Sequence, residues 1–300
     1  MATSLRVAFL GTGLMGAPMV RRLLGDGYPV SAWNRSPEKA SILAPEGALV
    51  ASSAASAVKD ADFVITMLSD GSAVADVLFN QGVAAAMKAG TILVDMSSIK
   101  PREARDHSAR LSDFDIRHID APVSGGTLGA DAGKLAIMAG GDEAVFGELA
   151  GIFGVFGRAI LVGPSGSGQL SKLANQAIVA INIGGVAEAL LLASAGGADP
   201  AKVRAALTGG FADSTILSQH GQRMLTRNFE PGGTIHIQIK DLENVLEEAT
   251  NMGVVMPLVQ SMLKMYQFIR DDLGQGDMDH SAALLGLEAK SKPHRVGSSS

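Results

Sequence analysis

A glycine-rich segment close to the start of the chain constrains the fold more than any other feature. Gly11-Thr12-Gly13-Leu14-Met15-Gly16 spells G-x-G-x-x-G directly after the apolar run Val7–Leu10. In this context the first glycine allows a tight turn, the second lets a ligand approach the backbone, and the third lets a helix pack close to the strand. The N-terminus of that helix presents free N–H groups to an anion. The segment therefore predicts a strand, a turn and a helix that together hold the pyrophosphate of a dinucleotide.

Short apolar runs recur along the first half of the chain, with helical patterning between them, as at 18–24 and 38–43. Runs of this kind predict parallel strands that are buried on both faces of a sheet. The repeating strand–helix order predicts an α/β fold with a Rossmann-type doubly wound parallel sheet. The runs are Val7–Leu10, Val30–Trp33, Phe63–Leu68, Ile92–Met96, Leu135–Met138 and Ala159–Val162.

The character of the sequence changes from Gly168 onward, because helical patterning continues but no series of strands follows. We expect one long apolar helix over 169–195, ended by Gly196-Gly197. Further helices are expected over 200–208, 216–225, 239–252 and 257–272. The predicted organisation is a dinucleotide-binding Rossmann domain over 1–163, an all-helical substrate and dimerisation domain over 164–289, and a flexible tail over 290–300.

Composition narrows the classes of function that fit the chain. Hydrophobic residues make up 47% and charged residues 18%, which is ordinary for a globular enzyme and too apolar for a disordered chain. The chain has no cysteine, so disulfides, thiolate nucleophiles and cysteine-ligated metal sites are excluded. A net charge of −5 offers no broad basic field for nucleic acid or an anionic membrane.

Signals for targeting and for metal binding are weak in this sequence. Residues 1–6 lead straight into the first strand pattern, without the architecture of a signal peptide, and we expect a cytoplasmic location. The most apolar stretch, 178–195, carries Asn182 and Glu188, so we interpret it as a buried helix and not as a membrane span. The six histidines form no H-E-x-x-H motif and no close pair, and we expect no metal site.

The end of the second predicted strand bears on which dinucleotide binds. Sites selective for NAD usually place Asp or Glu there to hold the ribose 2′-hydroxyl, whereas this chain has Asn34, Arg35 and Ser36. The missing carboxylate removes repulsion against a 2′-phosphate, and the Arg35 guanidinium can pair with one. Ser36 offers a further hydroxyl. We therefore favour NADP over NAD, and the alternative is that Arg35 stacks on adenine and both cofactors bind.

A lysine near the start of the long predicted helix is the candidate catalytic group. Lys172, Asn175 and Gln176 stand at i, i+3 and i+4, so they share one face of that helix. Lysine is rarely placed in an apolar helix without a partner or a role. An ammonium can donate a proton to a carbonyl oxygen as hydride reaches the carbon, and a lowered pKa would help it in the oxidative direction. The alternative is a surface lysine whose stem lies along apolar surface.

Two further segments carry candidate site residues. The turn Ser124-Gly125-Gly126 exposes backbone N–H groups and one hydroxyl, which suits a substrate carboxylate, and an ordinary turn is the alternative. Lys240-Asp241-Leu242 opens a later predicted helix. Lys240 either lines the cofactor or substrate cleft or belongs to the plain surface, and the residues alone leave both open.

Four segments resemble, in order, the motifs of the β-hydroxyacid dehydrogenase family, which includes 3-hydroxyisobutyrate dehydrogenase. Each motif is weak alone, but together they span nearly the whole chain and are specific. Residues 172–176, 179–183 and 279–282 resemble in particular the members that reduce tartronate semialdehyde. The four are Gly11-x-Gly13-Leu14-Met15-Gly16, Asp120-x-Pro122-Val123-Ser124-Gly125-Gly126, Gly166-x-Gly168-x-x-x-Lys172-x-x-Asn175 and Lys240-Asp241.

The resemblance implies an oxidoreductase that transfers hydride between NAD(P)H and a small 3-hydroxy acid or semialdehyde. Reduction of 2-hydroxy-3-oxopropionate to glycerate is the first expectation. The alternatives are 3-hydroxyisobutyrate dehydrogenation and the reduction of glyoxylate or succinic semialdehyde. The family's all-helical second domain and its dimers or tetramers also imply a homodimer or homotetramer here.

The resemblance also implies a role for each matching residue. Lys172 is implied as the catalytic acid and base. The family often has Thr where Ser98 stands and Asn where Gln176 stands, so both changes keep hydrogen bonding but leave the choice of substrate open. The implied substrate-binding residues are Ser124, Gly125, Gly126, Asn175 and Gln176, and the residues implied to line the cofactor include Met67, Leu68, Ser98 and Lys240.

Other nicotinamide enzymes fit the sequence less well. Zinc alcohol dehydrogenases typically use cysteine ligands, and no Tyr-x-x-x-Lys pair is present. Decarboxylating sugar-phosphate dehydrogenases have a much larger C-terminal domain, and imine reductases commonly lack lysine at the position of Lys172. The alternative from another class is a non-enzymatic dinucleotide-binding interaction module. Lys172 and the Ser124-Gly125-Gly126 turn both argue against it.

Overall fold

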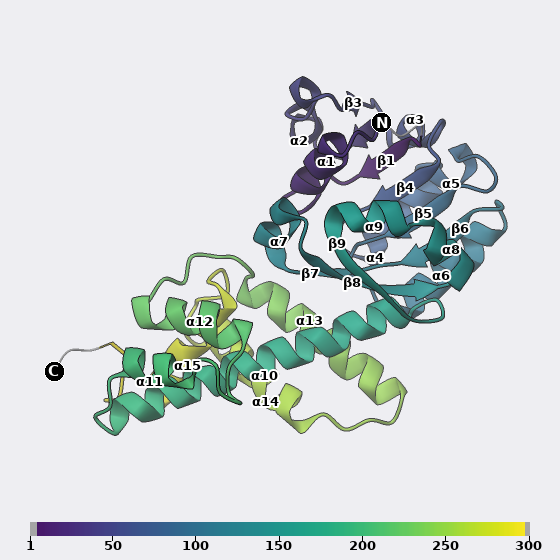
Figure 1. Cartoon of the computed structure of the whole chain (residues 1–300). Coiled ribbons are helices and arrows are strands. Elements are labelled where there is room, and N and C mark those ends of the chain that lie inside the picture. Colours follow the sequence, from purple (N-terminus) through teal and green to yellow (C-terminus); the bar gives the residue numbers. More distant parts are fainter. Residues whose placement is uncertain (1–4, 298–300) are drawn as a thin grey trace. The chain divides into compact units, whose positions relative to one another are not determined.

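The computed structural model describes residues 5–297 and divides the chain into two compact units. The first comprises Met1–Lys172 and the second Leu173–Ser300. The division falls inside helix α10 (Ser167–Ala195), whereas the sequence places it near Gly163, because one unbroken helix contributes residues to both units (Figure 1).

The first unit is built on a nine-stranded sheet with the order β3-β2-β1-β4-β5-β6-β8-β7, and β9 pairs with β8. Neighbours from β3 to β6 are parallel, β8 is antiparallel to β6 and β7, and β9 is parallel to β8. This confirms the Rossmann-type doubly wound sheet. The strands are β1 (Val7–Leu10), β2 (Val30–Trp33), β3 (Leu49–Val50), β4 (Phe63–Thr66), β5 (Ile92–Asp95), β6 (Arg117–Asp120), β7 (Val123–Ser124), β8 (Leu135–Gly141) and β9 (Gly157–Gly163).

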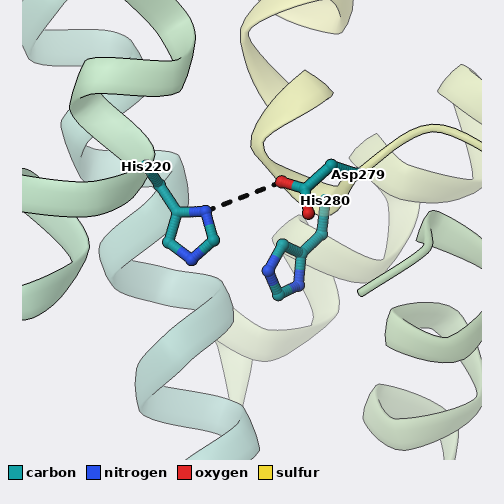
Figure 2. Close-up of side chains that lie close together, drawn as sticks. All are labelled: His220, Asp279 and His280. Atoms are coloured by element: carbon teal, nitrogen blue, oxygen red, sulfur yellow. Dashed lines mark ion pairs between the residues drawn. The ribbon is translucent and has the colours of Figure 1, made fainter. Parts of the chain in front are cut away.

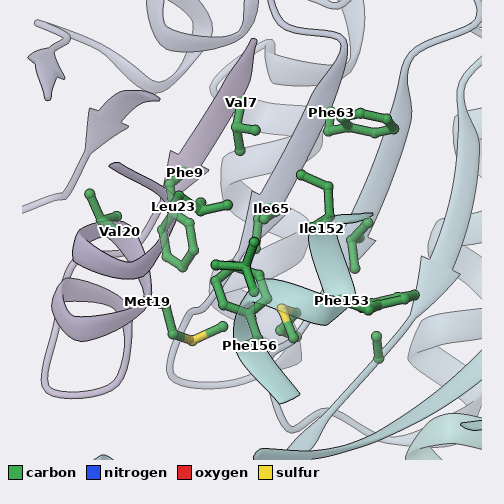
Figure 3. Close-up of a cluster of buried hydrophobic side chains, with 14 of the residues drawn as sticks. Val7, Phe9, Met19, Val20, Leu23, Phe63, Ile65, Ile152, Phe153 and Phe156 are labelled. Atoms are coloured by element: carbon green, nitrogen blue, oxygen red, sulfur yellow. The ribbon is translucent and has the colours of Figure 1, made fainter. Parts of the chain in front are cut away.

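Alternate residues of the central strands face two separate apolar cores, which explains why these strands read as continuous apolar runs. Val7 and Phe9 belong to one core with α1 and α9 (Figure 3), while Ala8 and Leu10 belong to the other with α3, α5 and α6. The helices of this unit are α1 (Gly16–Gly25), α2 (Pro37–Ser41), α3 (Ala54–Val58), α4 (Gly71–Ala75), α5 (Val83–Ala86), α6 (Pro101–Ser112), α7 (Gly126–Ala132), α8 (Glu143–Glu148) and α9 (Ala150–Phe156), with a π-helical turn over Asp76–Asn80 and a 3-10 turn over Ala44–Glu46.

The second unit is helical and forms its own core. Ala180, Ile183, Ala187 and Leu190 follow helical spacing along α10 and are fully buried in it. Among residues 5–297, α10 is the one helix whose length and composition would allow it to cross a membrane, a test that core helices of soluble proteins also pass. The other helices are α11 (Pro200–Leu207), α12 (Thr215–Thr226), α13 (Ile235–Asn251), α14 (Pro257–Asp271) and α15 (Ala283–Lys290), with a 3-10 turn over His280–Ala282.

Three details of this unit differ from the sequence-based expectations. Helix α13 begins at Ile235 and not near Lys240, because the Thr234 side chain accepts a hydrogen bond from the Ile237 N–H and caps the helix earlier. Helix α15 was not expected. The predicted flexible tail begins with the end of α15, and within it Val296 is fully buried and its N–H donates to Glu288; residues 298–300 lie outside the described range.

Candidate active site

The glycine-rich turn is shaped by close backbone contacts on two sides and open space on a third. Gly11 has φ of 108°, and a Cβ there would collide with the backbone oxygen of Met67. A Cβ on Gly16 would collide with the backbone oxygen of Gly11, so α1 packs directly against the turn. A Cβ on Gly13 would meet nothing within 4 Å. The turn therefore leaves room at Gly13 and at the N-terminus of α1 for a pyrophosphate, and the residues fit a dinucleotide.

Asn34 and Arg35 at the end of β2 have different surroundings. Asn34 Oδ1 accepts a hydrogen bond from the Thr12 N–H at 3.0 Å, and its Nδ2 donates to the Ser36 backbone oxygen at 3.1 Å. Asn34 thus ties the glycine-rich turn to the end of β2. Arg35 is exposed beside it, so its guanidinium is the group at this strand end that can meet a phosphate. Sequence reasoning could not show that the Asn34 amide is engaged in this way.

The residues expected to line the cofactor come from the ends of β4 and β5, next to the turn. The Met67 N–H donates to Leu10 at 2.9 Å, which holds β4 beside the end of β1. The Leu68 N–H donates to Ser97 Oγ at 2.9 Å, which joins the ends of β4 and β5. Ser98 follows and is half-buried. The structure thus brings Met67 and Leu68 together with Gly11 at the carboxyl edge of the sheet, where doubly wound folds bind ligands.

Lys172 lies at the Ser124-Gly125-Gly126 turn. Its Nζ donates to the backbone oxygen of Val123 at 2.8 Å. Ser124 ends β7, Gly125 and Gly126 have φ of 140° and 61°, and α7 begins at Gly126. These conformations suit glycine and turn the backbone sharply directly after Ser124. The structure therefore brings the predicted proton donor into contact with Val123, the residue just before the predicted carboxylate-binding turn. In the sequence, 48 positions separate Ser124 from Lys172 (172 − 124).

The first turn of α10 is attached to the sheet by a buried carboxylate that the sequence-based site omits. Asp120 is fully buried, and its two oxygens accept the N–H groups of Gly166 at 2.7 Å and Gln169 at 2.9 Å. Burial raises the pKa of Asp120 to about 7, against the two backbone hydrogen bonds, which lower it. Its parallel-strand partner Asp95 is also buried, which raises the pKa of that carboxyl to about 6. The available sequence signal was the place of Asp120 at the start of the motif that ends in Ser124-Gly125-Gly126.

In the second unit, one acidic residue, Asp241, links three of the predicted site residues, which are Asn175, Gln176 and Lys240. Gln176 Nε2 donates to Asp241 Oδ2 at 2.6 Å, and Asn175 Nδ2 donates to Gln176 Oε1 at 2.9 Å. Lys240 Nζ lies 3.5 Å from the other Asp241 oxygen. Asp241 is buried, and its place next to Lys240 in the sequence does not indicate this role. It orients the Gln176 amide, and Gln176 in turn orients Asn175.

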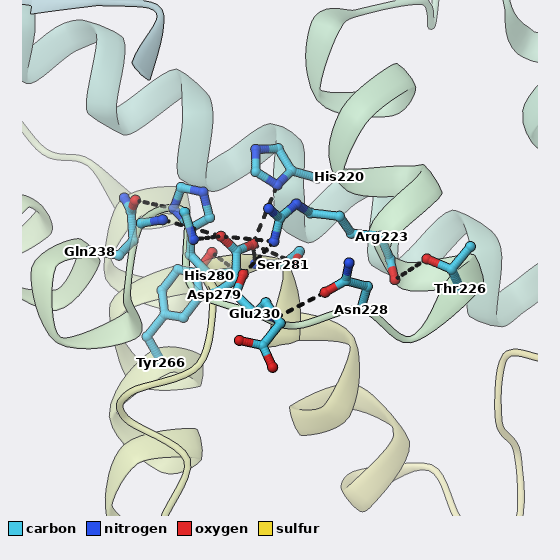
Figure 4. Close-up of polar contacts among 12 residues, drawn as sticks. His220, Arg223, Thr226, Asn228, Glu230, Gln238, Tyr266, Asp279, His280 and Ser281 are labelled. Carbon is cyan, nitrogen blue, oxygen red and sulfur yellow. Dashed lines mark hydrogen bonds and ion pairs between the residues drawn. The ribbon is translucent and has the colours of Figure 1, made fainter. Parts of the chain in front are cut away.

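A second polar cluster, which sequence reasoning missed, lies in the helical unit. His220, Asp279 and His280 offer ligand atoms within 4.8 Å of one another (Figure 2), so they could hold a metal ion by distance alone. However, Asp279 Oδ2 accepts from the Gly232 and Gly233 N–H groups, and Oδ1 from Ser281 N–H and Oγ. The Arg223 guanidinium also lies 3.5 Å from Asp279 (Figure 4), and a cation there would repel a metal ion.

The charges in this cluster support a structural interpretation. Burial raises the pKa of Asp279, but His220, the neighbouring charge of His280 and the Ser281 hydrogen bonds outweigh it and hold that pKa well below its usual range. Burial lowers the pKa of His280 to about 4, and its Nδ1 lies 2.9 Å from Gln238 Oε1. Asp279 is thus an ionised, fully hydrogen-bonded anchor for the segments around it, and we do not interpret the cluster as a metal centre.

Comparison with known proteins places both units in one family. The NAD-binding domain model of 6-phosphogluconate dehydrogenase matches residues 6–163, and the NAD-binding model of NADP-dependent 3-hydroxyisobutyrate dehydrogenase matches residues 166–287. The 2-hydroxy-3-oxopropionate reductase of Escherichia coli (strain K12) is 40% identical over 286 residues, which cover 95% of this chain and 97% of that protein.

Solved structures agree with this placement. Mycobacterium tuberculosis 3-hydroxyisobutyrate dehydrogenase, solved with L-serine, has a TM-score of 0.86 at 32% identity and covers 96% of this chain and 99% of its own. Psf3, solved with NADP+ and 2-OPP, has a TM-score of 0.84 at 26% identity and covers 94% and 99%. With the glycine-rich turn, the lysine and the Ser-Gly-Gly turn in place, the chain belongs to the β-hydroxyacid dehydrogenase family that includes 3-hydroxyisobutyrate dehydrogenase, and it is an NAD(P)-dependent oxidoreductase.

Proposed function

We propose that this enzyme reduces 2-hydroxy-3-oxopropionate to glycerate with NADPH, and that Lys172 donates the proton. The observation that carries the proposal is the 2.8 Å hydrogen bond from Lys172 Nζ to Val123, because it holds an ammonium beside the Ser124-Gly125-Gly126 turn. The likeness to the Escherichia coli 2-hydroxy-3-oxopropionate reductase supports the choice of substrate.

In the proposed mechanism the chain binds the substrate carboxylate and supplies the proton. The backbone N–H groups of Gly125 and Gly126 and the Ser124 hydroxyl hold the carboxylate. When bound, the reduced nicotinamide supplies the hydride that adds to the aldehyde carbon. Lys172 Nζ donates its proton to the aldehyde oxygen as negative charge develops there, and Asn175 contributes a hydrogen bond beside that oxygen. In the reverse direction the neutral amine of Lys172 accepts the hydroxyl proton.

The proposal assigns NADPH as the preferred cofactor through Arg35. Its exposed guanidinium can pair with a 2′-phosphate. Asn34 instead accepts a hydrogen bond from the Thr12 N–H and so supports the glycine-rich turn. The solved neighbour that holds NADP+ supports this assignment. The proposal also includes a cytoplasmic homodimer or homotetramer, for which the exposed apolar side chains Ile178 and Leu192 of α10 offer contact surface.

Replacing Arg35 with alanine is expected to raise the KM for NADPH by roughly 10- to 100-fold, because a charge-assisted contact of about 1.5–3 kcal/mol is lost. The KM for NADH should change little, since NADH has no 2′-phosphate. Steady-state kinetics with both cofactors measure this, and Arg158→Ala, an exposed arginine on β9, is the matched control. Equal losses for both cofactors would remove Arg35 from 2′-phosphate recognition.

A panel of small aldehyde acids tests the proposed substrate. With NADPH we expect the highest kcat/KM for 2-hydroxy-3-oxopropionate, and lower values for glyoxylate and succinic semialdehyde. Oxidation of 3-hydroxyisobutyrate with NADP+ is measured in parallel. A higher kcat/KM for one of these compounds would replace the proposed substrate with that one. No turnover of any of them would contradict the proposed class of substrate.

A further inference from the structure

Asp120 attaches the first turn of α10 to the end of β6. Its buried carboxylate accepts the N–H groups of Gly166 and Gln169 at 2.7 and 2.9 Å, and these bonds replace a side-chain cap at the start of the helix. A Cβ on Gly168 would collide with Met138 and would lie 2.9 Å from an Asp120 carboxylate oxygen. The helix start therefore has no room to shift toward the sheet, and Asp120 keeps it from moving away.

Gln169 attaches the same turn to the segment after β5. Its side chain is fully buried; Oε1 accepts the Ile99 N–H at 3.1 Å, and Nε2 donates to the Ser97 backbone oxygen at 2.8 Å. Ser97 Oγ in turn accepts the Leu68 N–H. A chain of hydrogen bonds thus connects the segment expected to line the cofactor with the first turn of α10.

Lys172 follows Gln169 by three residues, so both lie on the same face, about one helical turn apart. Their partners in the segment 120–123 are also three residues apart. Asp120 accepts from the start of the helix, and the backbone oxygen of Val123 accepts from Lys172 Nζ. The segment 120–123 therefore contacts α10 at two points, once through a side chain at the helix start and once through the backbone at Lys172. These two contacts fix both the rotation of the first turn of α10 about the helix axis and its position along that axis.

We infer that Asp120, assisted by Gln169, is a positioning residue that sets where the Lys172 ammonium lies relative to the Ser124-Gly125-Gly126 turn. The inference deepens the proposed function and rests on the proposed role of Lys172. Asp120 itself touches no reacting atom. Its effect is on geometry, and a misplacement of a catalytic group by about 1 Å can cost roughly 10²-fold in rate.

Asp120→Asn replaces one carboxylate oxygen with an NH₂ group, so the side chain can no longer accept the N–H groups of both Gly166 and Gln169 through separate oxygens. We expect kcat to fall by roughly 10²-fold, with the KM for NADPH unchanged, because the glycine-rich turn is untouched. Gln169→Met keeps a side chain of similar length without its hydrogen bonds, and it should lower kcat in the same direction. The matched control is Asp142→Asn, since Asp142 also accepts two backbone N–H groups, those of Ala144 and Val145, at the start of α8. It should leave kcat unchanged.

A double-mutant cycle with Lys172→Ala separates positioning from general damage. In the Lys172→Ala background, Asp120→Asn should change kcat by less than about threefold, because no ammonium remains to be misplaced. If Asp120→Asn or Gln169→Met lowers kcat by the same factor in both backgrounds, or not at all, the positioning role is wrong. Near-normal turnover of Lys172→Ala alone would instead refute the proposed function, so the two failures are distinguishable.

Discussion

Replacing Lys172 with alanine is expected to lower kcat by roughly 10²–10⁴-fold, the contribution usually made by a general acid. The KM and Kd for NADPH should stay near the wild-type values, because the glycine-rich turn and Arg35 do not involve this side chain. Steady-state turnover and cofactor titration measure the two quantities. A kcat within a few-fold of wild type would remove Lys172 from the mechanism.

Two further substitutions test whether Lys172 acts as a proton donor, as a positive charge or only as a hydrogen-bond donor to Val123. Lys172→Arg keeps a cation and N–H donors, but a guanidinium with a pKa above about 12 is a poor proton donor. Lys172→Met keeps the stem without the ammonium. Both should lose most of the activity, and Lys172→Arg should retain more of the substrate affinity. Full activity of Lys172→Arg would show that a cation at this position suffices and that Lys172 is not the proton donor.

Replacing Asp279 with asparagine is expected to lower the free energy of unfolding of the helical unit by about 1–3 kcal/mol, because an amide leaves some of the buried donors around this side chain without an acceptor. Asp279 is 1% exposed and joins Arg223 and His220 of α12 to the 232–233 segment and Ser281 (Figure 4). Urea unfolding followed by far-ultraviolet circular dichroism measures the loss. The control is Asp277→Asn, because the Asp277 side chain is fully exposed.

The effect of Asp279 should depend on pH in a defined direction. Its pKa in the folded chain is lowered, so its stabilising contribution is complete above the pKa of an unfolded carboxyl, about 3.9. The contribution is lost as the pH falls below that value toward the folded pKa. The stability difference between wild type and Asp279→Asn should therefore be constant from neutral pH to about 5 and shrink in stronger acid. A difference that grows on acidification would contradict this assignment.

Much of the first unit could be predicted from the sequence because its signals are local. The apolar runs at β1, β2, β4 and β5 and the G-x-G-x-x-G spacing at 11–16 depend on neighbouring residues only. Strands β3 and β7 are two residues long and carry no periodic pattern. Strand β6, Arg117–Asp120, begins and ends with a charged residue and contains His118, so it has no apolar run although it pairs with β5 and β8.

The parts of the site that were missed depend on contacts between distant residues. Asp120 meets Gly166 and Gln169 across 46 and 49 positions, and Gln176 meets Asp241 across 65. His220 lies in α12, whereas Asp279 precedes the 3-10 turn His280–Ala282, and the two share no motif. A single sequence gives the residue types at such positions but not their partners. The hydrogen bond from the Thr12 N–H to Asn34 is a similar case, since it shows that a residue expected to bind the cofactor also supports the glycine-rich turn.

The central claim is that Lys172 protonates the aldehyde oxygen during hydride transfer. A single-turnover measurement tests it most directly, with excess enzyme, NADPH and 2-hydroxy-3-oxopropionate, because product release then does not limit the observed rate. We expect NADPH oxidation by Lys172→Ala to be slower than by wild type by roughly 10²-fold or more, with an unchanged Kd for NADPH. Oxidation at the wild-type rate in that variant would contradict the account.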